Sequence, residues 1–195
     1  MLVWVVAAAH PASAAPPGVR PGGPVNSLST PRQNTTVTSS NWAGYVATGA
    51  SGTSTSASAN WTEPAGRCTG RGGKYAAFWV GIDGYTSPTV EQIGTEVDCS
   101  GFYPRYYAWY EVYPAEAPCC TADGGILPLT NFGTASFASA AANGQSLATF
   151  HPTEIVMPDT SVSAISSSGG FTVSYTGFPG FPGFPWSGPG RSAAD

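Results

Sequence analysis

The sequence predicts an all-β fold, and both its composition and its residue patterning support this prediction. The 195 residues include 25 glycines and 18 prolines, which interrupt helices throughout the chain. Apolar residues alternate with small polar residues in several short runs, as is typical of half-buried strands. Hydrophobic residues make up 42% of the chain and charged residues only 9%. The chain can therefore bury one core, and it is neither a disordered tail nor a coiled coil.

Turn residues bound each of the short runs that carry the strand pattern. The first two predicted strands, residues 40–47 and 56–62, flank a turn that is rich in Gly, Ser and Thr. The other predicted strands are residues 75–83, 89–97, 106–113, 134–140, 153–157 and 171–176. The sequence shows no amphipathic helix of useful length and no repeat of the solenoid kind.

The two ends of the chain differ in amino-acid composition from the strand-rich segment between them. Residues 2–9 are apolar and precede a small-x-small pattern typical of a signal-peptidase site, so residues 1–14 are interpreted as a secretory signal. The alternative interpretation of the apolar run is a buried strand. Residues 15–37 are rich in proline and glycine and predict a linker or a propeptide. The Phe-Pro-Gly repeat within residues 177–195 predicts an extended or disordered tail.

The charge and hydropathy of the chain argue against nucleic acids and membranes as binding partners. The formal net charge is -4, and the chain has a single lysine, Lys74, so it offers no basic surface for a nucleic acid. After the first apolar run, no stretch approaches the ~20 apolar residues that a membrane helix needs. We therefore expect a secreted, extracellular monomer without a nucleic acid or membrane partner.

Four cysteines fit an oxidising compartment, where disulfides form. Cys68 and Cys99 flank a strand-rich segment and are the expected disulfide pair. Cys119 and Cys120 are neighbours, and they could form a strained ring, stay reduced or pair elsewhere. Histidine is scarce and no Cys-x-x-Cys pair occurs, so we predict neither a metal site nor a cofactor.

Strand alternation brings polar groups and aromatic rings to the same face of the predicted sheet. Trp79 and Asp83 share one side of their strand, because side chains two residues apart point the same way. Trp109 and Glu111 share one side of residues 106–113, and Gln92 lies on the strand that precedes them. A surface of this kind suits an extended polymer that lies across a sheet.

Four sequence motifs, taken together, resemble those of one enzyme family. They are Ser-Asn-Trp-Ala-Gly at residues 40–44, Phe-Trp-Val-Gly-Ile-Asp-Gly at 78–84, Thr-Val-Glu-Gln-Ile-Gly at 89–94, and Tyr-Ala-Trp-Tyr-Glu-Val-Tyr-Pro at 107–114. In this order and spacing they resemble the glutamic peptidases, the eqolisin family, over residues 38–176. The resemblance implies an acid-acting endopeptidase on a concanavalin-like antiparallel β-sandwich, with proteins or peptides as substrates.

The resemblance also implies a catalytic pair. Gln92 matches the position of the family's glutamine, and Glu116, in Ala-Glu-Ala-Pro, matches that of its glutamate. An ionised Glu116 would take a proton from the attacking water, while Gln92 would position that water and stabilise the developing oxyanion. The substrate-binding residues expected around this pair are Trp79, Asp83, Trp109, Tyr110 and Glu111.

The chain departs from the family pattern between Pro114 and Ala115, where several strands are missing. We therefore expect a sandwich that lacks some strands and has bare core faces and unpaired edges. The alternative function is a non-catalytic sandwich, a degenerate peptidase that binds carbohydrate or peptide through its aromatic face. A serine triad that uses His151 is disfavoured because no Gly-x-Ser-x-Gly motif occurs. A retaining glycosidase would need paired carboxylates and would give Gln92 no role.

Overall fold

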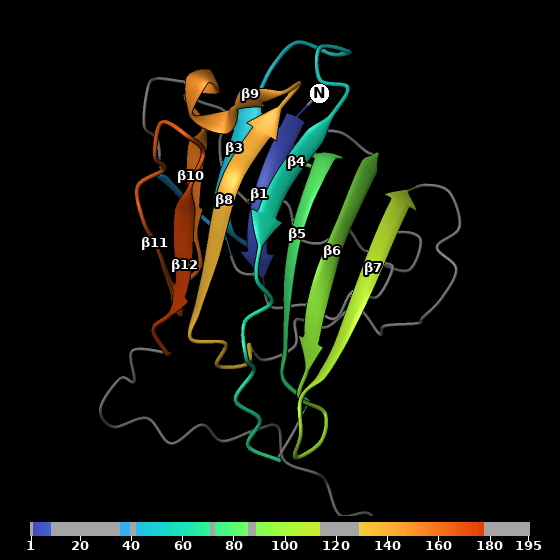
Figure 1. Cartoon of the computed structure of the whole chain (residues 1–195), viewed down its shortest axis with the longest axis vertical. Coiled ribbons are helices and arrows are strands. Elements are labelled where there is room, and N and C mark those ends of the chain that lie inside the picture. Colours follow the sequence, from blue (N-terminus) through green and yellow to red (C-terminus); the bar gives the residue numbers. More distant parts are fainter. Residues whose placement is uncertain are drawn as a thin grey trace, which may run out of the picture.

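Two β-sheets packed face to face make up most of the computed structural model (Figure 1). The structure describes residues 2–8, 36–39, 42–70, 73–85, 89–113 and 129–177. Among these residues the only helical element is a short 3-10 helix, η1 (Leu147–Phe150). The predicted all-β sandwich is therefore confirmed.

The larger sheet has seven strands and carries the three strands that the motifs single out. Its order is β2 (Thr36–Thr38), β10 (Thr153–Val156), β3 (Trp42–Thr48), β1 (Leu2–Ala8), β5 (Tyr75–Asp83), β6 (Val90–Asp98) and β7 (Arg105–Tyr113). All neighbours pair antiparallel except β2 and β10, which are parallel. The long strands β5, β6 and β7 coincide with predicted strands, because each is rich in β-branched or aromatic residues.

The smaller sheet covers one side of the larger one. Its order is β11 (Thr160–Val162), β12 (Phe171–Tyr175), β8 (Thr134–Ala142) and β4 (Ala57–Trp61), and β9 (Gln145–Ser146) pairs with β8. The pairing of β4 with β8 shifts register between Ser58 and Asn60, where the ladder is irregular. In Figure 1 this sheet lies in front of the larger sheet, and β4 lies nearest to β5.

The main core fills the space between the two sheets. Phe78 of β5 lies edge-on to Phe132, with ring centroids 5.3 Å apart, and Phe137 of β8 stacks on Phe171 of β12 at 4.9 Å. All four rings are buried. Burial of each such side chain stabilises the fold by roughly 1.5–3 kcal/mol, which fixes the orientation of β5 and its neighbours.

The predicted disulfide between Cys68 and Cys99 is present, with the two Cα atoms 5.0 Å apart. The backbone N–H of Cys99 also donates to the Lys74 carbonyl at 2.8 Å. Together these contacts fasten the segment before β5 to the end of β6. Cys119 and Cys120 lie outside the described residues.

Residues 2–8, the apolar run at the start of the chain, form the strand β1 between β3 and β5. The structure thus gives this run the conformation of a strand, whereas cleavage after Ala14 stays a prediction. Residues 9–35, which include most of the predicted linker, and residues 178–195 of the predicted tail lie outside the described residues.

One part of the core-facing side of the larger sheet is open to solvent. The smaller sheet ends at β4, so the side chains of β6 and β7 that continue this side extend past it. Ile93 is 59% exposed and Tyr110 60% exposed, although both are large and apolar in character. The sequence predicts such a bare core face from the strands missing between Pro114 and Ala115. Among the described residues, the exposed side of β6 and β7 agrees with that prediction.

Candidate active site

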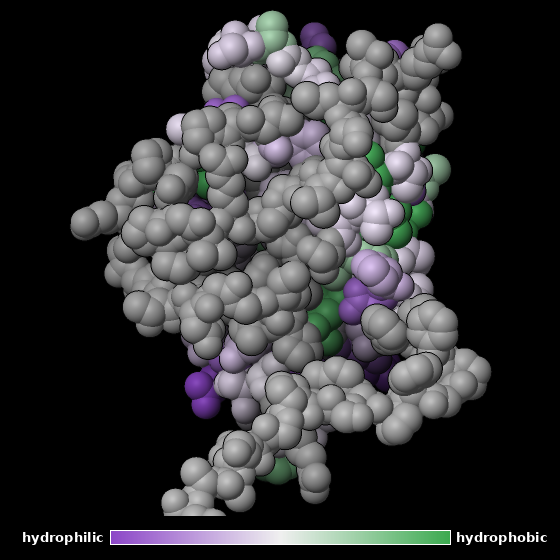
Figure 2. Space-filling view, turned by 180° about the vertical axis from the view of Figure 1, so that it is seen from behind, coloured by the Kyte–Doolittle hydropathy of each residue, from purple (hydrophilic) through white to green (hydrophobic). Residues whose placement is uncertain are grey.

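The outer face of the seven-stranded sheet, which points away from the smaller sheet, holds the candidate site. Figure 2 views the molecule from this side. In the antiparallel register, Gln92 of β6 lies opposite Gly81 of β5 on one side and Glu111 of β7 on the other. Two residues further along β6, Gly94 lies between Trp79 and Trp109. The face that strand alternation predicts is therefore assembled by three adjacent strands.

A hydrogen bond joins the two polar side chains at the centre of this face. The Gln92 amide nitrogen Nε2 donates to the Glu111 carboxylate oxygen Oε2, and both side chains are half-buried. Burial raises the pKa of the Glu111 carboxyl above its ordinary value, and the hydrogen bond from Gln92 opposes part of this rise. Glu111 therefore keeps its proton to a higher pH than an exposed glutamate does.

Two more polar atoms beside this pair have no hydrogen-bond partner within the described protein. They are the Gln92 amide oxygen Oε1 and the Trp109 indole nitrogen Nε1, and both are buried. Buried polar atoms normally form hydrogen bonds, because an unsatisfied one costs about 1–3 kcal/mol. The site thus offers one acceptor and one donor to a small polar molecule or to a substrate group.

Tryptophan rings lie on the same outer face of the sheet as the polar pair. Trp79 lies edge-on to Trp42 of β3 at a centroid distance of 6.2 Å, and Trp109 lies 6.1 Å from Trp79. Trp79 is only 4% exposed, so it packs beneath the surface, whereas Trp109 is half-buried beside Gln92. Trp109 lies on the same side of β7 as Glu111, two residues before it.

Two glycines make room for the functional side chains. A Cβ atom at Gly94 would lie 2.8 Å from Cζ2 of Trp109 and 2.4 Å from the Phe78 carbonyl oxygen. A Cβ at Gly81 would lie 2.9 Å from the Cβ of Gln92. All three separations are shorter than side chains tolerate, so glycine at these positions lets Gln92 and Trp109 lie close against the sheet.

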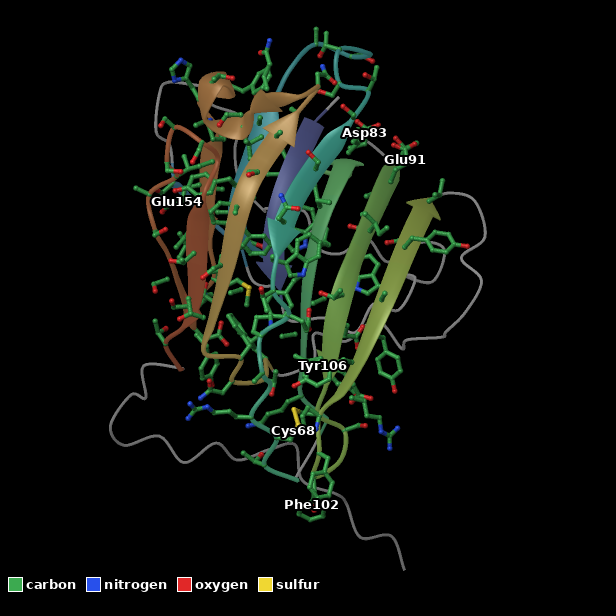
Figure 3. The ribbon with its side chains drawn as sticks, in the orientation of Figure 1. Cys68, Asp83, Glu91, Phe102, Tyr106 and Glu154 are labelled. Carbon is green, nitrogen blue, oxygen red and sulfur yellow. A yellow bond between two sulfur atoms is a disulfide. The ribbon has the colours of Figure 1, made fainter. Side chains whose placement is uncertain are left out.

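The remaining predicted residues lie farther from the Gln92–Glu111 pair. Asp83 is on the same face but at the end of β5, where its carboxylate accepts a hydrogen bond from the Thr89 hydroxyl at 3.1 Å (Figure 3). Tyr110 points to the opposite face of β7 from Glu111, because the two residues are adjacent in the strand. The structure therefore does not bring Tyr110 together with Gln92. Glu116 lies outside the described residues.

A second buried carboxyl group, Glu63, escaped the sequence analysis. Its Oε2 accepts a hydrogen bond from the hydroxyl of Thr95, which itself accepts a 2.8 Å bond from the Trp61 indole N–H. The Oε1 atom of Glu63 is buried without a partner, and burial raises the pKa of this carboxyl. Thr95 points to the inner side of β6, so this cluster lies across the sheet from Gln92. No motif marks Glu63, since only the fold brings it to Thr95.

Metal-binding and membrane-spanning features were sought in the same described part of the chain. It contains no group of three or more His, Cys, Asp or Glu side chains that could hold a metal ion. None of its helices is long and apolar enough to cross a membrane.

Comparison with known proteins gives one match. Residues 40–123 match the family model described as the Peptidase A4 family, while no curated protein and no solved structure matches the chain significantly. The match supports a peptidase whose substrates are proteins or peptides, and it agrees with the glutamic peptidase motifs of the sequence. Residues 40–123, the segment similar to the Peptidase A4 family, carry both partners of the Gln92–Glu111 hydrogen bond.

Proposed function

We propose that the chain is a secreted, acid-acting endopeptidase that hydrolyses peptide bonds with a glutamine and glutamate pair. The observation that carries this proposal is the Gln92 side chain, whose amide is held by Glu111 while its oxygen stays buried and unpartnered. An amide fixed in this way on a family-matched segment is suited to orient a water molecule and a substrate carbonyl.

Gln92 is the amide member of the proposed pair. One hydrogen of its Nε2 is taken by Glu111, and the second hydrogen and the Oε1 atom are left for ligands. The free N–H can donate to the oxyanion that develops on the scissile carbonyl, a contribution of about 3–4 kcal/mol where comparable donors have been removed. The oxygen can accept a hydrogen bond from the attacking water.

Glu116 is the proposed general base, on the strength of the family resemblance. A glutamate with an ordinary pKa of ~4.3 is ionised in mildly acidic water, whereas a histidine base would be protonated there and unable to take a proton. Glu116 would remove a proton from water as its oxygen attacks the carbonyl, and would then return that proton to the leaving amine.

Glu111 is proposed as a positioning residue with an electrostatic role. Its protonated form holds the Gln92 amide without adding a negative charge to the site. Its ionised form would repel the oxyanion that forms beside Gln92, because two negative charges at short range raise the energy of the transition state. Since burial raises the pKa of Glu111, the favourable protonated form persists into mildly acidic solution.

Casein digestion at mildly acidic and at neutral pH tests the proposal directly. Wild-type protein should cleave casein in acid, and Gln92→Ala and Glu116→Gln should each lower kcat by at least about a hundredfold. Glu91→Gln is the matched control, because Glu91 adjoins Gln92 in sequence but is exposed and points to the other face of β6. Full activity in Gln92→Ala would contradict the proposal. A dead Glu111→Gln together with an active Glu116→Gln would instead make Glu111 the base.

A non-catalytic binding function is the second candidate, and one observation favours it. Tyr106, Tyr107 and Tyr110 of the edge strand β7 are all exposed, and such rings commonly bind sugars or peptides. Retained affinity for a glycan or a peptide in a protein that cleaves nothing at any pH would favour this function. Tyr107 and Tyr110 lie on opposite faces of β7, so loss of that affinity in Tyr107→Ala or in Tyr110→Ala would identify which face binds.

Secretion is supported by the disulfide, because such bonds persist in oxidising compartments. N-terminal sequencing of protein recovered from the medium of expressing cells tests it. Recovery of the protein from the medium would establish export, whereas protein found only inside the cells would contradict the proposal. The N-terminal sequence would show whether residues 1–14 are removed.

A further inference from the structure

The seven-stranded sheet is continuous only through β1. Residues 2–8 pair in antiparallel register with Thr48–Trp42 of β3 on one side, and residues 3–8 pair with Ile82–Ala77 of β5 on the other. Within the described residues β3 and β5 do not pair with each other, so β1 alone joins β2, β10 and β3 to β5, β6 and β7. In Figure 1, β1 lies between β3 and β5.

We call the space between β3 and β5 that β1 fills the slot, and these two strands are its walls. Both walls are apolar on each side of the sheet. Trp42–Ala47 of β3 and Ala76–Val80 of β5 are buried throughout. On the inner side, Tyr45 and Phe78 belong to the core between the sheets, and on the outer side Trp42 and Trp79 belong to a second apolar cluster. A strand between these walls is enclosed on both faces, so it must be apolar at every position rather than at alternate ones.

The sequence Leu-Val-Trp-Val-Val-Ala-Ala of β1 meets this requirement. We propose that the slot between β3 and β5 is a strand-acceptor site for an extended apolar peptide, and that the chain's own residues 2–8 are its occupant. The slot holds this segment by main-chain hydrogen bonds to both walls, as in other cases of strand addition. The proposal does not depend on peptidase activity, and it excludes removal of residues 1–14 as a leader. Exported protein that begins at Ala15 and carries no residues 1–14 would overturn it.

The cost of an empty slot explains why the segment would be retained. About half of the paired residues on each wall direct their N–H and C=O groups toward β1. Without β1 these groups would face an apolar cavity, and each unsatisfied group costs about 1–3 kcal/mol. Because main-chain hydrogen bonds to both walls hold β1 in place, residues 2–8 should stay bound even when the chain that links them to β2 is cut.

A cut made after folding tests this inference on the full chain. A recognition sequence for a site-specific protease is inserted within residues 15–35, the protein is folded, and the chain is then cleaved. The N-terminal fragment should co-elute with the rest of the chain in native gel filtration, in equal molar amount, and should separate from it in guanidinium. Separation of the two parts in native buffer would overturn the proposal.

Val5→Pro in the same cleavable chain is the control, because proline removes a backbone donor from the middle of β1. Its fragment should co-elute at least tenfold less than the wild-type fragment. Co-elution of the Val5→Pro fragment at the wild-type level would mean that strand pairing does not hold it.

Peptide exchange gives a second measurement in case Val5→Pro does not fold. Cleaved wild-type protein is incubated with an excess of a fluorescent synthetic peptide of residues 1–14, or with the same peptide N-methylated at Val5. The unmodified peptide should enter the protein peak, and the methylated peptide should do so at least tenfold less. Equal incorporation of both peptides, or of neither, would overturn the proposal.

Discussion

At the residue scale, the outer face depends on how closely Trp109 approaches the backbone of β6. A methyl group at Gly94 would lie 2.4 Å from a backbone carbonyl oxygen and 2.7 Å from the Cβ of Trp79. Neither atom can move without shifting β5. We predict that Gly94→Ala destabilises the protein by about 1–3 kcal/mol, as overpacking of a tight site does, and displaces the Trp109 ring. Urea denaturation and tryptophan fluorescence measure the two effects.

Gly101→Ala is the matched control for that substitution. A Cβ at Gly101 would meet nothing within 4 Å, and the residue lies in the turn between β6 and β7. Its stability should change by less than about 0.5 kcal/mol. Equal stability of Gly94→Ala and Gly101→Ala would show that the Trp109 ring is not confined in this way.

The proposed electrostatic role of Glu111 leads to a pH profile that a purely structural role would not produce. Glutamine at position 111 can still accept the hydrogen bond from Gln92 but stays neutral at every pH. We predict that Glu111→Gln keeps most of the acid activity and extends cleavage toward neutral pH, because no negative charge appears beside the oxyanion. The measurement is kcat/KM for a peptide substrate across this range. An unchanged pH profile would remove the proposed role of Glu111.

At the element scale, the Cys68–Cys99 disulfide fastens the segment that precedes β5 to the end of β6, with 31 residues of separation. A bond that closes a loop of this length restricts the unfolded chain and stabilises the fold by about 3–4 kcal/mol. We predict this loss for the double variant Cys68→Ala/Cys99→Ala, measured by guanidinium denaturation. The oxidised and reduced forms of the wild-type protein should differ by a similar amount, and equal midpoints would contradict the prediction.

The long strands were predictable because their pattern is local, and the short ones were not. Each of β5, β6 and β7 has nine residues and is rich in β-branched or aromatic side chains, which favours a strand. By contrast, β2, β9 and β11 have only two or three residues each, and their neighbours in the sheets determine their conformation. For residues 2–8 the sequence alone could not decide between two interpretations. A cleavable leader and a strand enclosed on both faces require the same unbroken apolar run.

The candidate site was predictable as a face but not as a set of contacts. Alternation assigns Gln92 and Glu111 to compatible sides of their strands, yet their hydrogen bond also requires the register between β6 and β7. Likewise, the burial of Trp79 depends on Trp42, which comes from a strand that is distant in sequence. Glu63 becomes notable only because the fold brings it to Thr95.

At the scale of the whole molecule, buried carboxyl groups determine how stability responds to pH. In the described part of the chain, three carboxyl groups have a pKa above its ordinary value, and burial is the largest cause each time. These groups are Glu63, Glu111 and Asp159. A raised pKa means that the folded state binds protons more tightly than the unfolded state does.

The sign of the pH effect follows from this difference in proton binding. Between the ordinary pKa values of the unfolded chain, about 4, and the higher values of the folded protein, the folded state carries more protons, so stability falls as pH rises. We therefore predict a larger free energy of unfolding at about pH 4 than at about pH 7. Urea denaturation at the two pH values measures this difference, and equal or greater stability at neutral pH would contradict it.

Glu63→Gln separates this cause from other effects of acid. Glutamine can accept the hydrogen bond from Thr95 without a buried charge, so the variant should be more stable than wild type at neutral pH and similar to it in acid. Its stability should consequently vary less with pH. The exposed Glu91→Gln serves as the control and should leave the pH dependence unchanged. Glu63→Gln and Glu91→Gln could change the pH dependence of the free energy of unfolding equally. In that case the net charge of the chain, rather than the burial of Glu63, governs this pH dependence.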